Sequence, residues 1–187
     1  ATHLGINGSL SSSEIDDKAL SAAQFLYIEG YLVSSEAAFE AVLEAQRIAM
    51  DNQVAVSLTL SDVGMVENFR TEFDELVGHG VDFIFCNEEE AKLWTRTESR
   101  LDAANALANQ SGRFAMTLSG DGAYVSGEDG QPCFVPADKV QALDTTGAGD
   151  TFAGAVLSGL IAGESLSNAT VRAHELARTV VSRFGAR

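Results

Sequence analysis

Residues 54–85, VAVSLTLSDVGMVENFRTEFDELVGHGVDFIF, contain two apolar runs of strand length on either side of a helical pattern. The runs at 54–60 and 81–85 are rich in aliphatic and aromatic residues, which is typical of buried parallel strands. Residues 71–77 have apolar side chains at helical spacing and predict a helix between them. A strand, a helix and a second strand in this order predict a parallel sheet covered by helices.

The same alternation of strands and helices continues on both sides of this stretch. Apolar side chains recur at helical spacing after Ser34 and Ser35, which are candidate helix caps. Further strands are expected at residues 24–28 and 114–118, and further helices at residues 36–48, 87–94 and 101–108. The sequence therefore predicts an α/β fold with a mostly parallel sheet.

The pattern changes after residue 112. Four glycines separate short apolar segments between residues 120 and 130, which predicts a hairpin or a meander of strands. Two helices are expected after it, at residues 148–161 and 166–184. The first of these helices is rich in glycine and alanine, so it can approach a neighbouring backbone closely.

The composition restricts the classes of partner. With 187 residues, of which 45% are hydrophobic, the chain is long enough for one domain with a sizeable core. The 27 acidic residues outnumber the 12 basic ones and give a formal charge of -15, so nucleic acid and anionic membranes are poor partners. No apolar stretch is long enough to span a bilayer and no signal peptide is evident, so a cytoplasmic location is expected.

The string DTTGAGDTF at residues 144–152 concentrates the candidate chemistry. A glycine-rich turn leads into a helix here, so consecutive backbone amides can converge where the helix dipole favours negative charge. Asp150 could accept a proton from a hydroxyl while the amides stabilise charge on a transferred phosphoryl group. The alternative is that the glycines and Asp150 only cap a helix.

Other kinds of site find little support in the sequence. Cys86 and Cys133 lack metal-ligand spacing and are expected to be free thiols, while His3 and His79 have no partners at ligand spacing. Ser119 lacks the G-x-S-x-G context of a hydrolase nucleophile, and neither a Walker A string nor a G-x-G-x-x-G turn occurs. The glycine-rich turn therefore stays the main candidate.

This turn, continued by Ala153-Gly154-Ala155, resembles the C-terminal signature of the PfkB family, also called the ribokinase-like kinases. The resemblance implies a three-layer α/β/α fold and transfer of the γ-phosphate of ATP, with Mg²⁺, to a hydroxyl of a sugar or nucleoside. It also implies that Asp150 is the catalytic base and that an anion hole is formed by the amides of Gly147, Ala148 and Gly149.

The resemblance further implies a site for a monovalent cation, usually K⁺, beside the anion hole. Its predicted ligands are the side chains of Asp144 and Thr146 and the backbone carbonyls around Val180, Arg183 and Gly185. The alternative is that the two side chains only stabilise the turn.

The string Asn87-Glu88-Glu89-Glu90-Ala91 resembles the family's N-x-x-E element at the end of a strand. By this resemblance Asn87 approaches the ATP phosphates, and Glu90 organises water around Mg²⁺, a cation that keeps several waters. Acidic residues in a first helical turn are also ordinary partners of the helix dipole, and this alternative stays open.

Two further segments resemble parts of the nucleotide pocket of these kinases. Their candidate residues are Thr117, Ser119, Gly120, Gly122, His174 and Ala177. The first four belong to a strand and turn that would approach the ribose and phosphates, or that form a simple β-turn. The last two would lie beside adenine, although a histidine on a helix surface is an equal alternative for His174.

The resemblance covers only the C-terminal portion of the family's usual length, so the fold is expected to be truncated at the N-terminal side. The lid and the acidic residue that holds the substrate hydroxyls have no counterpart, since residues 1–13 resemble the segment after the lid. Weak or absent kinase activity is therefore expected for this chain alone. An exposed strand edge would favour self-association, so a homodimer is expected.

The substrate is the least determined feature. Residues 27–32, 58–62 and 83–87 look most like the adenosine-kinase-like branch, with ribokinase, fructokinase and ketodeoxygluconate kinase as competitors. The alternative function is a non-catalytic nucleotide-binding or assembly module that is inactive because the substrate-binding half is absent. ATP turnover that depends on Asp150 would distinguish the enzyme from the module.

Overall fold

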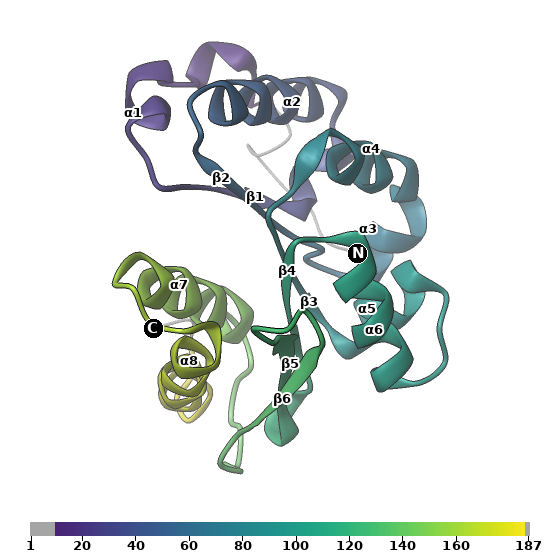
Figure 1. Cartoon of the computed structure of the whole chain (residues 1–187), viewed down its shortest axis with the longest axis vertical. Helices are drawn as coiled ribbons and strands as arrows, with labels where there is room; N and C mark the ends of the chain where they lie inside the picture. The colour runs from purple at the N-terminus through teal and green to yellow at the C-terminus, as the bar shows by residue number, and fades with distance from the viewer. Residues whose placement is uncertain (1–9, 186–187) are drawn as a thin grey trace. The chain divides into compact units, whose positions relative to one another are not determined.

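The computed structural model describes residues 10–185, so the expectations for His3 and residues 1–9 lie outside the described residues. The chain divides into two compact units, with the boundary between Arg113 and Phe114. Figure 1 labels the helices and strands along the chain. None of the helices between residues 10 and 185 is both long and apolar enough to cross a bilayer.

The first unit alternates helices and strands along the chain. Its elements are η2 (Ser12–Glu14), α1 (Asp17–Ser21), β1 (Phe25–Glu29), η3 (Gly30–Ser34), α2 (Glu36–Asp51), β2 (Ala55–Thr59), α3 (Val63–Asn68), α4 (Arg70–Gly80), β3 (Phe83–Asn87), α5 (Glu88–Thr95) and α6 (Arg100–Gln110). Strand β4 (Arg113–Thr117) starts at the boundary. The second unit continues with η4 (Ser119–Asp121), β5 (Gly122–Ser126), β6 (Pro132–Pro136), α7 (Ala148–Ile161) and α8 (Leu166–Val181).

The strands of the first unit are parallel, as the sequence predicts. β1 pairs with β2 along its whole length, and β2 pairs with β3 from Ser57 opposite Phe83 to Thr59 opposite Phe85. Parallel pairing brings the carboxyl ends of the three strands to the same edge of the sheet. Asn87, the last residue of β3, therefore lies at the edge where α/β proteins commonly bind ligands. The predicted α/β class is confirmed.

The core of the first unit forms between these strands and the helices beside them. Its completely buried large side chains include Val56, Leu58, Phe73, Leu76, Phe83 and Ile84. The rings of Phe83 and Phe85 stack with their centroids 4.4 Å apart. Burial of one such side chain contributes about 1.5–3 kcal/mol. The strand that ends at Asn87 is thus anchored by its aromatic residues.

A buried glutamine ties α2 to α4 inside this core. Gln46 is almost fully buried on α2, and its Nε2 donates hydrogen bonds to the carbonyls of Leu76 at 2.9 Å and Gly80 at 2.8 Å. These carbonyls belong to the last turns of α4, where helical partners run out. Gln46 therefore fixes the end of α4 against α2.

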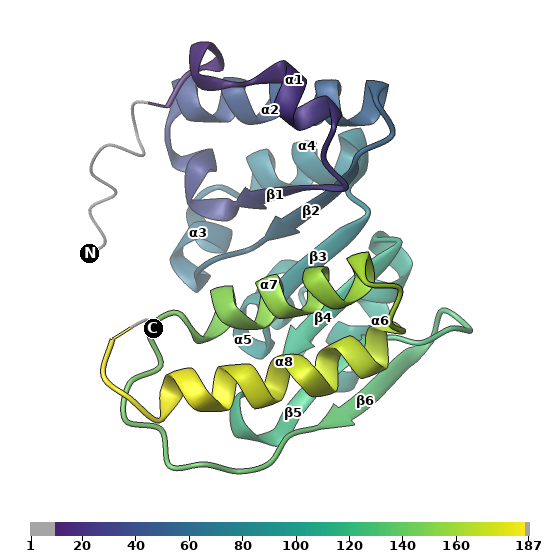
Figure 2. The same ribbon diagram turned by 90° about the vertical axis from the view of Figure 1, so that its left-hand side faces the viewer.

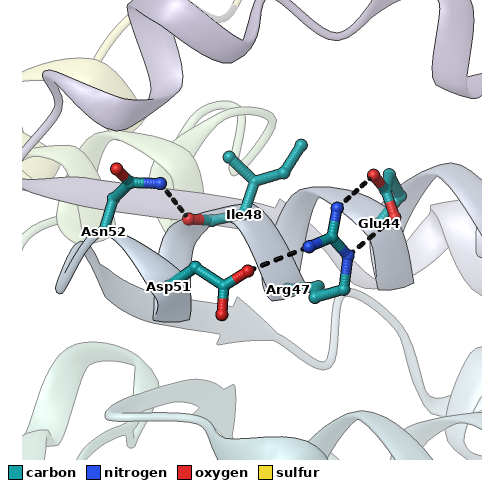
Figure 3. A network of polar contacts seen from close by, with 5 residues as sticks. All are labelled: Glu44, Arg47, Ile48, Asp51 and Asn52. Atoms are coloured by element: carbon teal, nitrogen blue, oxygen red, sulfur yellow. Dashed lines mark hydrogen bonds and ion pairs between the residues drawn. The ribbon is translucent and has the colours of Figure 1, made fainter.

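Helix α2 also carries a small network of ion pairs on exposed side chains (Figure 3). The Arg47 guanidinium contacts Glu44 at 2.6 Å and Asp51 at 2.9 Å, one turn away in each direction. The Asn52 side chain donates to the Ile48 carbonyl at 2.8 Å at the end of the helix. Exposed pairs of this kind contribute only about 0.3–0.5 kcal/mol each.

The second unit contains the predicted meander. β4, β5 and β6 pair antiparallel in succession, from Ala115 opposite Val125 to Ser126 opposite Pro132. Helices α7 and α8 lie side by side in the same unit (Figure 2). α8 ends at Val181, three residues before the predicted end, because the Val181 carbonyl accepts a hydrogen bond from the Leu143 amide.

The local features of the first unit that differ from the sequence-based expectation include α1, α3 and the start of β3. Residues 63–68 form α3, which the apolar pattern does not predict, after the side chain of Asp62 accepts a bond from the Gly64 amide. Residues 81–82 precede β3 instead of belonging to it. The Asp82 carboxylate accepts a hydrogen bond of 2.7 Å from the Val56 amide, so a side chain takes the place of a strand carbonyl.

Candidate active-site residues

The predicted glycine-rich turn is the start of helix α7. Gly147 directly precedes the helix with a φ of +76°, a left-handed conformation that glycine adopts without strain. The Asp144 carboxylate accepts a hydrogen bond of 2.9 Å from the Thr146 amide, and the Ala148 amide donates to the Thr145 carbonyl at 3.2 Å. These contacts turn the chain sharply into the helix.

Several backbone amides at this turn are available to a ligand. Within residues 10–185, the amides of Gly147, Gly149 and Asp150 donate no hydrogen bond, and the first helical bond runs from the Thr151 amide. The Ala148 amide is engaged within the turn. The positive end of the helix dipole adds attraction for an anion. Two of the three predicted anion-hole amides are thus unengaged.

Asp150 stands beside these amides in the first turn of α7. Its side chain is exposed, and it makes no hydrogen bond or ion pair with the residues that the structure describes. A carboxylate in this condition can accept a proton from a hydroxyl held next to it. The geometry therefore suits the predicted role of Asp150 as a base.

The Asp144 carboxylate also joins the start of α7 to the chain beyond α8. Its Oδ2 accepts a hydrogen bond of 2.9 Å from the Gly185 amide, 41 residues later. Hydrogen bonds from Thr146 and then from Gly185 lower the pKa of Asp144. Nearby, the Val180 carbonyl accepts from the Arg183 amide at 3.1 Å. The structure thus brings three of the predicted K⁺ ligands, Asp144, Thr146 and Gly185, to one place.

His174 is half-buried on α8 and packs against Phe152 of α7. Its ring lies 5.3 Å from that of Phe152 between centroids, and its Nε2 is buried without a hydrogen-bond partner among the described residues. Burial lowers the pKa of His174, against a smaller opposing effect from the Val135 backbone. Burial therefore favours the neutral imidazole. Ala177 follows on the same helix and is half-buried.

The predicted pocket residues lie at the end of β4, in the turn after it and at the start of β5, and they are Thr117, Ser119, Gly120 and Gly122. Gly122 has a φ of +131°, and a Cβ there would collide with the Val135 carbonyl. Packing of the hairpin is therefore sufficient to require glycine at this position. A Cβ on Gly120 would meet no atom within 4 Å, so its backbone is open on that side.

Asn87 and Glu90 form a reciprocal cap at the start of α5 in the first unit. The Asn87 Oδ1 accepts a hydrogen bond from the Glu90 amide, and the Glu90 Oε2 accepts one from the Asn87 amide, both at 2.9 Å. The Asn87 Nδ2 also donates to the Glu90 Oε1 at 2.6 Å. The cap gives both residues a structural role, and it orients both side chains.

The environment of Glu90 is unusual for a helix cap. The residue is only 4% exposed, and burial raises the pKa of Glu90 to about 7, with the charges of Asp62 and Glu89 adding to the rise. The hydrogen bond from the Asn87 amide opposes it. Strongly shifted carboxylates are enriched at functional sites. A divalent cation beside Glu90 would favour its ionised form, so this carboxylate suits the predicted link to Mg²⁺.

Asp62 contributes to the raised pKa of Glu90, and the sequence pattern did not single it out. It follows β2, caps α3, and its charge acts on the pKa of Glu90. Ser61 before it has a φ of +65°, which is uncommon for a residue with a side chain, and its Oγ donates to the Glu29 carboxylate at 3.3 Å. An aspartate three residues after the end of a buried strand was the signal that could have revealed it.

Comparison with known proteins identifies similar chains. The chain is 29% identical over 192 residues to an adenosine kinase of Schizophyllum commune, a match that covers 93% of this chain and 55% of that protein. It is 28% identical over 181 residues to a 5-dehydro-2-deoxygluconokinase of Listeria monocytogenes, with the same two coverages. The chain therefore spans about half the length of the curated relatives it matches.

A solved structure is similar to this chain in three dimensions, again over about half of its own length. The crystal structure of adenosine kinase from Sinorhizobium meliloti matches with a TM-score of 0.90 and 34% identity, over 96% of this chain and 55% of that chain. This match confirms the predicted ribokinase-like fold. The family model of the pfkB carbohydrate kinases matches residues 2–187, which is nearly the whole sequence. On this match, and on the glycine-rich turn that opens α7, the chain belongs to the pfkB family of carbohydrate kinases.

Proposed function

We propose that this chain supplies the nucleotide-binding part of a kinase that transfers the γ-phosphoryl group of ATP to a hydroxyl of a sugar or nucleoside. The start of α7 carries the proposal. Free amides at a helix N-terminus suit an anionic phosphoryl group, and the exposed Asp150 carboxylate lies in the same turn.

Asp150 is assigned the role of general base. As the acceptor oxygen forms its bond to the γ-phosphorus, the bond from that phosphorus to the bridging oxygen breaks, and ADP leaves. The proton of the acceptor hydroxyl goes to the Asp150 carboxylate. The amides of Gly147 and Gly149 stabilise the charge on the transferred group, with that of Ala148 added if its bond within the turn opens.

Asn87 and Glu90 are assigned to the phosphates and to Mg²⁺. The reciprocal cap holds the Asn87 side chain in a single orientation, and the buried Glu90 carboxylate can accept hydrogen bonds from water around the cation. Bound Mg²⁺ would neutralise charge on the phosphates during transfer. A K⁺ ion held by Asp144, Thr146 and nearby carbonyls would support the turn before α7.

Adenosine is the acceptor to test first, because two of the similar proteins are adenosine kinases. Sugars and sugar acids follow, since another relative is a 5-dehydro-2-deoxygluconokinase. The chain spans about half the length of these relatives, which favours a second outcome for the chain alone. In that outcome it binds ATP as a nucleotide-binding or assembly module without turnover.

The test combines binding with turnover. Binding of ATP is measured by calorimetry, and ADP formation is followed with Mg²⁺, ATP and a panel of nucleosides and sugars. Asp150→Asn should lower turnover by roughly a hundredfold or more and leave ATP affinity within about twofold. Asp138→Asn is the matched control, because Asp138 is an exposed carboxylate of the same unit, and among residues 10–185 it pairs with Arg178, at 3.5 Å.

Each result of this experiment has one meaning. Turnover that is lost in Asp150→Asn and kept in Asp138→Asn supports the kinase. ATP binding without ADP formation supports the module instead. A chain that does not bind ATP at all contradicts both.

A further inference from the structure

Helix α5 carries the proposed phosphate and magnesium residues at one end and an unusual set of contacts at the other. Asn87 and Glu90 form its first turn. Its last turn ends at Arg96, which has a left-handed φ of +57°, so the carbonyls before it lack helical partners.

Arg70, at the start of α4, occupies this end of α5. Its Nη1 donates a hydrogen bond to the Leu93 carbonyl at 3.3 Å, and its Nη2 donates to the Trp94 carbonyl. A guanidinium at a helix C-terminus satisfies free carbonyls and also complements the negative end of the helix dipole. Arg70 is therefore the C-terminal cap of α5, supplied from another helix.

Asp74 completes the arrangement one turn further along α4. Its Oδ1 accepts a hydrogen bond of 3.0 Å from the Trp94 Nε1, and its Oδ2 lies 3.7 Å from the Arg70 Nε. The Trp94 residue is only 3% exposed, so the indole is locked in the core with its single donor satisfied. Arg70, Asp74 and Trp94 thus form a closed set of contacts, which we name the α5 clamp.

We propose that the α5 clamp is a positioning device: Arg70 and Asp74 set the placement of the first turn of α5, and with it the Asn87 and Glu90 side chains. This inference rests on the proposed function for what that first turn binds. In this proposal Arg70 and Asp74 position Glu90 and do not themselves contact the substrate.

The length of α5 makes the coupling direct. The helix has eight residues, which is little more than two turns, so a tilt at its last turn also displaces its first turn. Glu90 depends on placement because it is buried and satisfied by Asn87 alone within the cap. Groups that orient the residues around a cation typically change its affinity by roughly 10–100-fold when they are removed.

The test compares Arg70→Met with Arg47→Met. Arg47 is another arginine of the first unit with acidic partners, but it lies on α2 and makes its ion pairs with Glu44 and Asp51 (Figure 3). Asp74→Ala and Asp74→Asn form a second pair on an exposed position. Asparagine keeps an oxygen that accepts from the Trp94 Nε1, whereas alanine does not.

Two quantities are measured for every variant. The first is hydrogen exchange of the Glu90 amide, relative to amides of α2, because this amide is held by the Asn87 side chain. The second is the ratio of the ATP dissociation constants without and with Mg²⁺. A loss of overall stability would change both dissociation constants together, and the ratio would stay constant.

The clamp is supported if Arg70→Met and Asp74→Ala accelerate exchange of the Glu90 amide and lower the ratio of the ATP dissociation constants without and with Mg²⁺ roughly tenfold. Arg47→Met and Asp74→Asn should resemble the wild type in both measurements. Faster exchange confined to the last turn, or an unchanged ratio, overturns it. If the wild-type chain shows no magnesium effect, the proposed function fails, and exchange of the Glu90 amide alone decides whether the clamp positions the first turn.

Discussion

At the scale of single residues, Glu90 is the side chain whose state depends most on its surroundings. Burial raises the pKa of Glu90 to about 7, against a usual value of 4.5. Below pH 4.5 the residue is protonated in both the folded and the unfolded chain, so folding does not have to bury a charged carboxylate. Between pH 4.5 and 7 the unfolded chain releases the proton first, and the folded state loses stability as the pH rises.

Glu90→Gln should remove this pH dependence. The shift from 4.5 to about 7 corresponds to about 3 kcal/mol, so the free energy of unfolding of the wild type, relative to the variant, should fall by that amount from pH 4.5 to pH 8. Loss of the Asn87 contacts changes the free energy of unfolding by the same amount at every pH, so it does not alter the dependence of that free energy on pH. Denaturant unfolding across this pH range measures it.

Glu75→Gln is the control for this experiment, because Glu75 is an exposed carboxylate on α4. A flat difference for Glu90→Gln over the same range would mean that Glu90 is ionised normally in the folded chain.

At the scale of elements, the packing of α7 against α8 depends on small residues. A Cβ on Gly159 would lie 2.7 Å from the Cβ of Ala169 on α8, and near the ends of the Arg172 and Glu164 side chains. The two long side chains can move, but the Cβ of Ala169 is fixed to the backbone of its helix. Close approach of the two helices therefore requires glycine at this position.

Gly159→Ala should destabilise the chain by about 1–3 kcal/mol, because α8 must shift to admit the methyl group. Gly154→Ala, in the same helix, is the matched control. A Cβ there would meet no atom within 4 Å, so alanine should stabilise the chain by up to about 1 kcal/mol through its higher helix propensity. Thermal and denaturant unfolding of both variants provide the measurement, and equal effects would contradict the packing argument.

At the scale of the whole molecule, the chain has the family fold over about half the length of its relatives. Among the described strands, β1 pairs with β2 and stands at the edge of the sheet in the strand order. The strand reads Phe-Leu-Tyr-Ile-Glu from Phe25 to Glu29, without proline or lysine. Such an edge can pair with another chain.

We expect the chain alone to self-associate through β1. Sedimentation over a range of concentrations should show a dimer, and Leu26→Lys should shift the chain towards the monomer because a charge on an edge strand opposes pairing. Leu101→Lys, on α6, is the control, since Leu101 is exposed and lies outside the sheet. A wild-type monomer at every concentration, or equal behaviour of the two variants, would contradict this expectation.

The elements that the sequence predicts best are those whose signal is local. α7 has the predicted bounds, and the strands and most helices fall within a few residues of their expected places, because the periods of strands and helices are visible within one segment. α3 was missed because a capping aspartate, and not an apolar pattern, starts it. The predicted end of α8 was too late, because the Leu143 amide, which precedes α7, donates a hydrogen bond to the Val181 carbonyl at the end of α8.

The amino-acid sequence by itself determined the family, the α/β class and the position of the glycine-rich turn before α7, since each depends on residues a few positions apart. Only the tertiary structure decided the burial of Glu90 beside Asp62, the bond between Asp144 and Gly185, and the capping of α5 by Arg70. Their physical cause is long-range packing: desolvation and hydrogen bonding depend on which distant segments meet, and no local pattern records that.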